Sequence, residues 1–303
     1  MEGVIINELS LNGQFLNSHD FWKTGMPSFH RALKETISCN IKHLFKKSEF
    51  YQAKATPNET LYSLLTAPEV RIIDEARLYK SILARAIHED PFWDCDPKQD
   101  MSVQYFVGME DVSRSSVAEA TARPVCLLSF IRSSYEKDPI IVQKDGVDFP
   151  VRNVWDGNQL YAILFELGKL SLKEYIVSRF SGLKLDFSLI DEKNGFFLIN
   201  HENQTEFIDS FRKFIELDWH EIVTDKGLDY KSYNKTRKSR HYFTDDLWQK
   251  DIKKFRITER NRCFGYVDNG VFYVLRFDLD HELSNVGLLN LHYSLFCGNI
   301  QKQ

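Results

Sequence analysis

An Asn-Gly pair at Asn269 and Gly270 constrains the fold more than any other feature of this sequence. Both residues tolerate positive φ, which the two central positions of a type I′ turn require. The flanking segments 262–268 and 271–278 alternate in character, and another such segment precedes them at 252–257. The sequence therefore predicts three antiparallel strands, the last two joined by a tight hairpin.

The predicted strands and the residues before them carry many cations. Arg262 shares a strand face with Tyr266, and Arg276 interrupts the otherwise apolar strand after the turn. The chain as a whole has a formal net charge of -4, so this basic surface is local. The other cations that we single out are Arg240, Lys253, Lys254, Arg256 and Arg260.

A strand face of this kind can hold a polyanion. The forked guanidinium of arginine binds phosphate oxygens in pairs, and tyrosine rings can stack on bases. The alternative is a solvated surface whose cations protect a sheet edge from aggregation. In that case Tyr266 would be a half-buried strand aromatic, and Arg276 would pair with Asp278 or Glu282.

Upstream of the strands the pattern is mainly helical. Apolar residues recur at helical spacing in 27–48, 59–66, 71–90, 115–124 and 157–180. The last segment is broken near Gly168, and Ser171 with Glu174 can form a capping box after the break. In this region only the apolar run 125–131 predicts a strand.

From residue 181 onward, strand and helix patterns alternate. The segments 183–190 and 195–200 resemble strands, and 205–219 is an amphipathic helix. We therefore expect an α+β protein in two parts. A mostly helical domain of unknown role occupies 1–180, and a small antiparallel sheet with flanking helices occupies 181–303. A chain of 303 residues is long enough for two domains.

Composition and motif searches narrow the class of protein. The five cysteines are scattered and form no CxxC pair, which argues against a disulfide framework or a zinc finger and fits a reducing cytoplasm. No apolar run of membrane-spanning length and no signal peptide is present, so we expect a cytoplasmic protein. Phosphate-loop, GxSxG, HExxH and Rossmann motifs are absent, and we expect no cofactor.

An acidic stretch lies between His88 and Asp100 and permits two interpretations. Its other acids are Glu89, Asp90, Asp94 and Asp96. Carboxylates beside a histidine are the ligands that a Mg²⁺- or Mn²⁺-dependent nuclease would use. The Asp-Pro pairs instead favour turns, and a polar loop anchored by Phe92 and Trp93 is the simpler interpretation.

The C-terminal region resembles the RelE/ParE superfamily of bacterial toxins. The likeness spans roughly 185–290 and consists of a strand, a helix, a polar segment and three antiparallel strands. KKFRI, RCFGY, DNG, VFYVLRF and DLDHEL stand where the family has a basic strand, an arginine-bearing strand, a tight turn, an apolar strand and a basic or histidine-bearing tail. The matched residues are Arg262 on the central strand, Lys253, Lys254 and Arg256 on the basic strand, and His281 in the tail. Family members are usually much shorter, so the first two thirds of this chain lie outside the resemblance.

The resemblance implies RNA cleavage without a metal, since RelE-type members cut mRNA in the ribosomal A site with the RNA 2′-hydroxyl as nucleophile. Such cleavage needs a base, a cation for the pentavalent phosphate and an acid for the leaving oxygen. Arg262 and Arg256 would stabilise the charge, and His281 or Tyr266 would transfer protons. Cations that would hold the RNA are Lys253, Lys254, Arg260, Arg276 and Arg240.

The same resemblance leaves a second class of function open. ParE-type members inhibit gyrase without chemistry, so the region could be a non-catalytic module that binds nucleic acid or protein. The implied partners are RNA or the ribosome, and an antitoxin or another protein of a phage-defence system. In that setting the long N-terminal region would be a built-in inhibitor or a sensor.

Overall fold

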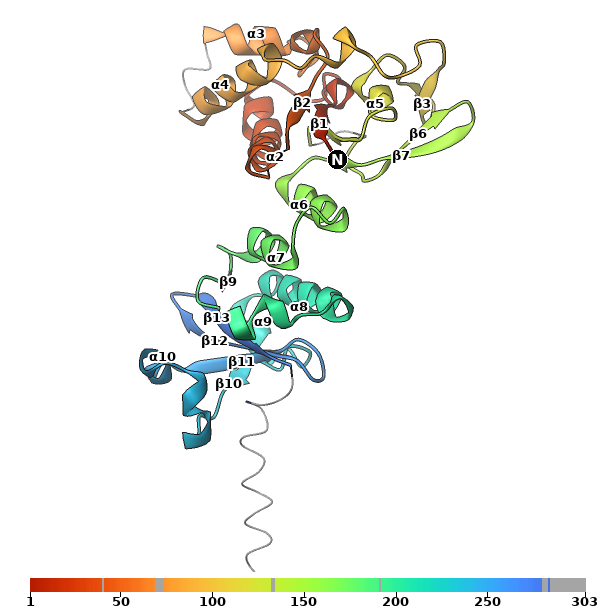
Figure 1. Cartoon of the computed structure of the whole chain (residues 1–303). Coiled ribbons are helices and arrows are strands. Elements are labelled where there is room, and N and C mark those ends of the chain that lie inside the picture. The colour runs from red at the N-terminus through yellow and green to blue at the C-terminus, as the bar shows by residue number, and fades with distance from the viewer. Residues whose placement is uncertain (40, 69–73, 132–133, 191, 280–282, 284–303) are drawn as a thin grey trace, which may run out of the picture. The chain divides into compact units, whose positions relative to one another are not determined.

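The computed structural model describes residues 1–39, 41–68, 74–131, 134–190, 192–279 and Leu283. The chain divides into two compact units, Met1–Lys169 and Leu170–Gln303 (Figure 1). The division therefore falls at the break expected near Gly168, which has a φ of +65°, and before the boundary expected at 180. Glycine adopts this left-handed conformation without steric cost, so it ends a helix readily.

A parallel sheet forms the centre of the N-terminal unit. Its strands are β1 (Gly3–Ile6), β2 (His43–Phe45), β5 (Val125–Leu128) and β8 (Asn153–Val154), in the order β2-β1-β5-β8, with every neighbouring pair parallel. β1 and β5 are buried at every position. Strands of this kind are covered on both faces, so their sequences are continuous apolar runs and do not alternate.

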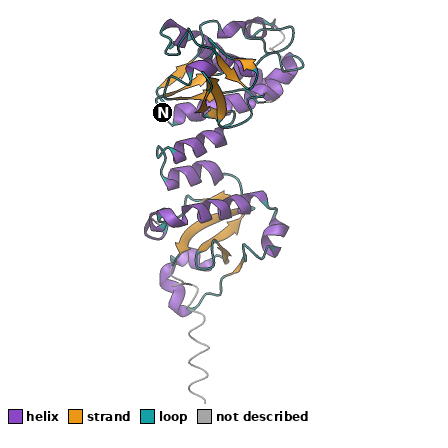
Figure 2. Ribbon diagram, turned by 90° about the vertical axis from the view of Figure 1, so that its right-hand side faces the viewer, coloured by secondary structure: helices purple, strands orange, loops and turns teal. Residues whose placement is uncertain are grey.

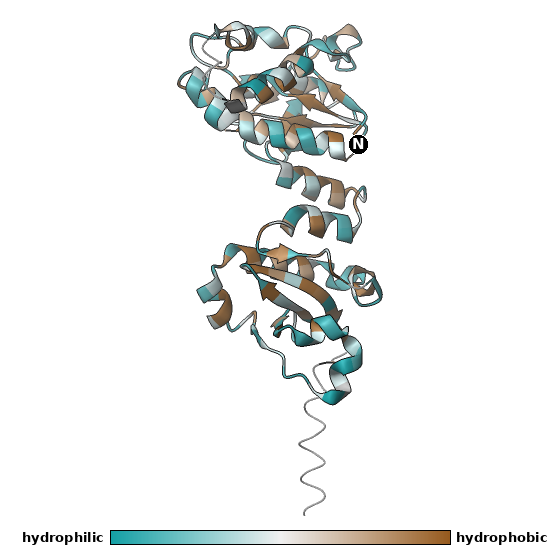
Figure 3. Ribbon diagram, turned by 90° about the vertical axis from the view of Figure 1, so that its left-hand side faces the viewer, coloured by the Kyte–Doolittle hydropathy of each residue, from teal (hydrophilic) through white to brown (hydrophobic). Residues whose placement is uncertain are grey.

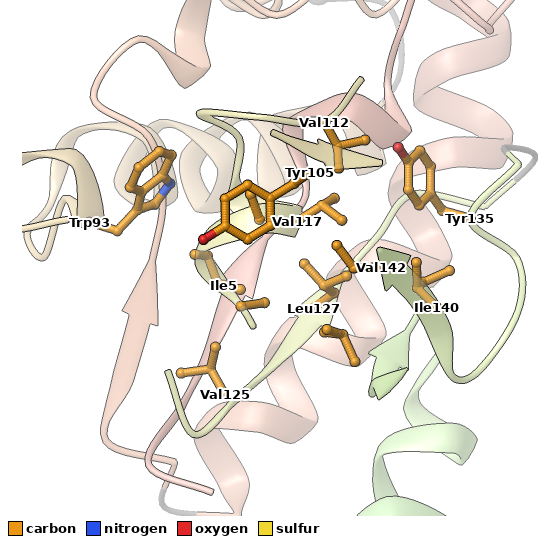
Figure 4. Packing of buried hydrophobic residues seen from close by; sticks show 13 residues of the cluster. Ile5, Trp93, Tyr105, Val112, Val117, Val125, Leu127, Tyr135, Ile140 and Val142 are labelled. Atoms are coloured by element: carbon orange, nitrogen blue, oxygen red, sulfur yellow. The ribbon is translucent and has the colours of Figure 1, made fainter. Parts of the chain in front are cut away.

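A second, antiparallel sheet packs against the first. It consists of β3 (Tyr105–Val107), β4 (Glu110–Asp111), β6 (Ile140–Lys144) and β7 (Val147–Val151), in the order β4-β3-β6-β7. Figure 4 shows the apolar cluster between them, in which Ile5 and Leu127 of the parallel sheet meet Tyr105, Ile140 and Val142. This core fixes the parallel strands on one side.

Helices complete the N-terminal unit. They are η1 (Glu8–Ser10), α1 (Ser18–Asp20), η2 (Phe21–Gly25), α2 (Met26–Ser38), η3 (Phe50–Gln52), α3 (Leu61–Thr66), α4 (Asp74–His88), η5 (Trp93–Cys95), α5 (Ser116–Glu119) and α6 (Gly157–Glu166). Figure 1 shows α2 and the β6–β7 hairpin on opposite sides of β1. Phe29 of α2 stacks on Phe130, which closely follows β5, with ring centroids 4.1 Å apart.

Several predictions for this unit need correction. The helix predicted at 27–48 ends at Ser38, and the chain then enters β2. The expectation of a single strand was wrong, because the described part of the unit has two sheets. β1 is buried at every position and lacks the alternation that identifies a strand in sequence, and β2, β3, β4 and β8 are only two or three residues long, whereas β6 does alternate in burial and was missed. The helix at 59–66 is confirmed as α3, and the strand at 125–131 as β5.

The C-terminal unit holds the predicted three-stranded sheet, extended at both edges. β10 (Lys231–Ser232), β11 (Ile252–Arg256), β12 (Arg262–Asp268), β13 (Val271–Asp278) and β9 (Leu185–Asp186) follow in the order β10-β11-β12-β13-β9. β9 is parallel to β13, and the other pairs are antiparallel. The predicted turn is confirmed, since Asn269 and Gly270 have φ values of 49° and 77°.

The helices of this unit are α7 (Leu172–Phe180), η6 (Glu192–Asn194), η7 (Phe196–Leu198), η8 (His201–Asn203), α8 (Gln204–Glu216), α9 (Trp219–Thr224), η9 (Arg237–Tyr242) and α10 (Asp245–Gln249). The capping box of Ser171 and Glu174 is confirmed at the start of α7. The strand expected at 195–200 was wrong, because a short 3-10 turn buries Phe196 and Ile199 three positions apart.

An aromatic core lies between α8 and the C-terminal sheet. In Figure 2 the long helix of this unit crosses one face of the orange sheet, and in Figure 3 the strands carry long hydrophobic stretches. Phe211 and Phe214 of α8 contact Phe255, Phe272 and Phe277 of the strands. One face of this sheet therefore packs against α8. None of the described helices combines the length and apolar character needed to cross a membrane.

Candidate nucleic-acid interface

The second face of the C-terminal sheet carries most of the predicted cations. The register places Arg256 of β11 directly opposite Arg262 of β12, and Lys254 opposite Phe264, which in turn is opposite Arg276 of β13. Residues directly opposite in a ladder point to the same face. We call Lys254, Arg256, Arg262 and Arg276 the basic cluster. Sequence reasoning therefore selected side chains from three strands that the fold brings together.

Arg256 and Arg262 stand side by side although like charges opposite one another destabilise a sheet. Arg256 forms ion pairs with Asp229 at 3.3 Å and with Glu259 at 3.4 Å. Its Nε is buried and makes no hydrogen bond within the described chain. Arg262 donates through one nitrogen to the carbonyl oxygens of Thr258 and Asn261 at 2.6 and 3.0 Å, in the turn between the two strands.

The cations of the basic cluster are partly buried and repel one another, so their positive charge is only partly compensated. Partial burial, followed by the charge of Arg256, lowers the pKa of Arg262. Partial burial likewise lowers the pKa of Lys254, and the charges of Lys231 and Arg262 add to the effect. Asp229 compensates part of this positive charge. The pKa of Asp229 lies below its usual range, mainly because of the hydrogen bond with Lys231. An anion that bound here would relieve the remaining repulsion.

Arg276 occupies the covered end of the cluster. Only 6% of its surface is exposed, and it donates to Asn194 Oδ1 at 2.8 Å. Its guanidinium also lies 4.7 Å from the ring centroid of Tyr242. A direct contact between Arg276 and phosphate would therefore require η9 to move. Arg276 is therefore buried, contrary to the surface position considered from the sequence, and Glu282, one of the two ion-pair partners considered there, lies outside the described residues.

The segment between β10 and β11 covers part of the same face. Tyr233 and Phe243 belong to a core cluster with Ile252, Phe264 and Leu275. Tyr233 also lies under the Lys254 ammonium, 5.8 Å from it. Sequence reasoning missed this cover, because the segment looked only polar and basic. Its aromatic residues at 230, 233, 242, 243 and 248 were the available signal.

Tyr266 lies on the cluster's face but toward the hairpin. It stacks on Tyr273 with ring centroids 5.3 Å apart and an angle of 15° between the planes. The ammonium of Lys250 lies 5.2 Å from the Tyr266 ring centroid. Both tyrosines are half-buried, so their outer edges remain accessible. The half-buried strand aromatic considered from the sequence and a base-stacking surface are both compatible with this geometry.

The other predicted residues lie outside the cluster. Lys253 points to the opposite face from Lys254 and pairs with Asp251 at 2.7 Å. Arg260 is exposed in the turn before β12. Arg240 pairs with Asp245 at 2.6 Å beyond the aromatic cover. His281 lies outside the described residues.

The acidic stretch 88–100 is a structured loop whose acids act separately. Asp94 accepts hydrogen bonds from the backbone N and Oγ of Ser48, and Asp96 pairs with Lys98 at 2.7 Å. Trp93 is buried and donates its indole N–H to Ser116 Oγ at 2.9 Å, which confirms the anchoring role predicted for it. Across the described residues, no three potential metal ligands of the His, Cys, Asp and Glu types lie together.

Comparison of the chain with protein-family models, with curated proteins and with solved structures finds no match.

Proposed function

We propose that the C-terminal unit binds RNA through the basic cluster and cleaves it without a metal. The observation that carries the proposal is the cross-strand pair of Arg256 and Arg262, held half-buried beside Lys254. Sheets avoid directly opposed like charges unless a counter-charge is supplied. Asp229 and Glu259 supply part of it from within the chain, and phosphate oxygens would supply the rest.

The tyrosine pair favours RNA over other polyanions. Tyr266 lies four residues from Arg262 along β12, which corresponds to about 13 Å of strand. Stacked tyrosines offer an aromatic surface for an unstacked base, and single-stranded RNA is the nucleic acid most often read in this way. A chain laid across the sheet could thus contact the arginines through a phosphate and the tyrosines through a base.

Cleavage is the part of the proposal that rests on the RelE/ParE resemblance. That family's order of a strand, a helix, a polar segment and three antiparallel strands is compared with β9, α8, residues 224–250 and β11 to β13, although α9, β10, η9 and α10 also lie between α8 and β11. Arg262 and Arg256 would stabilise charge on the phosphate, and Tyr266 or His281 would transfer protons. On this proposal the protein is a toxin that limits growth or defends against phage.

Binding without cleavage is the second candidate, and two contacts favour it. One guanidinium nitrogen of Arg262 donates hydrogen bonds to backbone carbonyl oxygens, and Arg276 is enclosed by Asn194 and Tyr242. Side chains held in this way can position a ligand without taking part in chemistry. The binding partner would then be nucleic acid, or an acidic protein of the same defence system.

The deciding experiment uses the full chain and a labelled single-stranded RNA, with and without ribosomes, in the presence of EDTA. Arg262→Ala is the test variant. Arg212→Ala on α8 is the matched control, because it removes an exposed arginine far from the cluster's face. We expect RNA cleavage in EDTA by the natural protein and the control, and a loss of at least about 100-fold in Arg262→Ala.

Three other outcomes have distinct meanings. Binding that Arg262→Ala weakens, without any cleavage, would favour the non-catalytic module. Cleavage that EDTA abolishes, and that Asp94→Ala or Asp96→Ala also abolishes, would favour a metal-dependent nuclease. An RNA affinity equal in all three proteins would show that the basic cluster is not the binding surface.

A further inference from the structure

The N-terminal unit contains a cavity where parallel sheets commonly bind ligands. The strand order β2-β1-β5-β8 runs from β1 to β2 in one direction and from β5 to β8 in the other. The order therefore reverses between β1 and β5. In open parallel sheets, ligands bind in the crevice outside the carboxyl ends of the strands at this switch point.

A cavity of about 190 Å³ lies at this switch point. Its walls are Leu9, Ser10, Leu11, Asn12 and Gln14, which follow β1, with Ser134 and Tyr135, which follow β5, and Glu110 of β4. A water molecule takes about 30 Å³ of liquid, so the space suits a small ligand or one end of a larger one. Both strands adjoining the switch point thus contribute a loop to its wall.

Beneath the cavity, the strand ends are held by buried polar side chains. Asn7 donates to Ser129 Oγ at 2.9 Å, and Ser129 donates to Asn153 Oδ1 at 2.7 Å. Ser10 Oγ donates to the Asn7 carbonyl and accepts from the Phe130 amide. These four side chains are fully buried and hydrogen-bonded to one another or to backbone. They form a rigid base to the cavity, and because they are hydrogen-bonded to one another or to backbone, a ligand would bind to other side chains.

The cavity is rich in oxygen acceptors. Gln14 uses its amide nitrogen on the Ser10 carbonyl, and its Oε1 is buried with no hydrogen-bond donor from the described chain. Glu8 accepts from the Ser116 amide through Oε1, whereas its Oε2 is likewise buried and lacks a donor. Glu110 is exposed at the wall, where Tyr135 also lies.

Tyr135 lines the cavity, and both acids affect the ionisation of its hydroxyl. Burial raises its pKa above the ordinary value, and the charges of Glu110 and Glu8 raise it further. Of the two acids, Glu110 lines the cavity together with Tyr135. In Figure 4 the hydroxyl points away from Ile140. Burial also raises the pKa of Glu8, against hydrogen bonds from Ser116 and the charge of Lys47. A buried acceptor without a donor costs free energy that a donating ligand would recover.

We infer that this cavity binds a small organic cation through a guanidinium or primary ammonium head. The walls offer the buried acceptor oxygen of Gln14 and the surface carboxylate of Glu110, and Glu8 next to Leu9 of the wall adds a buried carboxylate, which together match a head that only donates hydrogen bonds. The apolar side chains of Leu9 and Leu11 would contact a short aliphatic body. A metal ion is a poorer match, because no three metal-ligating side chains gather within the described part of the chain.

Calorimetric titration of the full chain tests this inference with n-butylguanidinium, n-butylammonium and n-butylurea. The urea has nearly the shape of the guanidinium but carries no charge. We expect one butylguanidinium or butylammonium to bind per chain, and butylurea to bind at least about 10-fold more weakly. Glu8→Gln and Gln14→Met should each weaken binding of the cation about 5-fold or more. Gln52→Met, at an exposed position, is the matched control and should bind as the natural protein does.

Gln14→Glu keeps the test decisive if the weakening variants fail to fold, because an added carboxylate should tighten binding of the cation. Absence of saturable binding, equal binding of butylurea, or binding that no substitution alters would overturn the inference.

Discussion

The parallel sheet of the N-terminal unit and the antiparallel sheet of the C-terminal unit place their polar side chains in opposite ways. β1 and β5 are apolar along their whole length, and the polar residues Asn7 and Ser129 begin where these strands end. β11 and β12 instead carry Arg256 and Arg262 within the strands, on one face. The first sheet collects polar groups at its edge, and the second displays them across its surface.

The difference follows from what covers each sheet. Helices and a second sheet cover both faces of the parallel sheet, so chemistry is possible only at the ends of its strands. The antiparallel sheet gives one face to the aromatic residues of α8, and the other face remains available for charge. The candidate sites have opposite character for this reason. One is an enclosed cavity of acceptors, and the other is a partly covered surface of donors.

The largest expected effect comes from the aromatic core of the C-terminal unit. Phe211 is fully buried against five other phenylalanines, so Phe211→Ala should lower the free energy of unfolding of this unit by about 3–5 kcal/mol. Hydrogen exchange should show β11 to β13 losing protection while β1 and β5 keep theirs. The control is Phe197→Ala, because Phe197 is 93% exposed. Equal loss of protection in both sheets would contradict the separation of the two units.

A smaller effect is expected at the base of the N-terminal cavity. Asn153 accepts from Ser129 and donates to the carbonyl oxygens of Tyr135 and Lys137. Asn153→Ala should therefore cost about 1–3 kcal/mol of unfolding free energy, since it leaves buried partners unsatisfied. Urea denaturation measures the loss, with exposed Asn58→Ala as the control. A loss no greater than that of the control would mean that water replaces the side chain.

RNA binding by the basic cluster should weaken as the salt concentration rises. Each phosphate contact on a single strand contributes about 0.7 to the slope of log K against log salt concentration. Arg256→Ala should lower the slope of RNA binding by about this amount and weaken binding roughly 10-fold at low salt. Arg212→Ala should leave the slope as it is. An unchanged slope in Arg256→Ala would place the RNA on another surface.

The smallest effect is expected at Asp229, whose carboxylate would compete with RNA phosphate for Lys231 and Arg256. Asp229 pairs with Lys231 and Arg256, so Asp229→Asn should raise RNA affinity a few-fold by freeing both cations. Lys231 first, then Arg256 and Arg262, keep the pKa of Asp229 below its ordinary 3.8. The carboxylate therefore stabilises the fold above pH 3.8, by under about 1 kcal/mol because it is partly exposed, and this is lost as pH falls through the folded pKa. Acid unfolding of Asp229→Asn should lack that component, whereas weaker RNA binding by the variant would assign Asp229 a supporting role.

Local patterns determined much of the C-terminal unit. The Asn269-Gly270 turn, the three strands around it and the amphipathic helix α8 all follow from spacing and turn chemistry, which act over a few residues. The same alternation placed Arg262 and Tyr266 on one face of β12. The capping box at Ser171 of the same unit was also predicted, and in the N-terminal unit α3 lies where its periodicity predicts.

Only the tertiary structure decided which of these side chains are exposed and which lie together. Arg276 looked like a surface cation in sequence, but Asn194 and Tyr242 enclose it. The parallel sheet escaped prediction because strands covered on both faces show no alternation, and its cavity joins loops about 120 residues apart, as the Asn7–Ser129 separation of 122 shows. Sequence pattern records local geometry, whereas burial and convergence depend on contacts between distant segments, so the chain by itself could not show them.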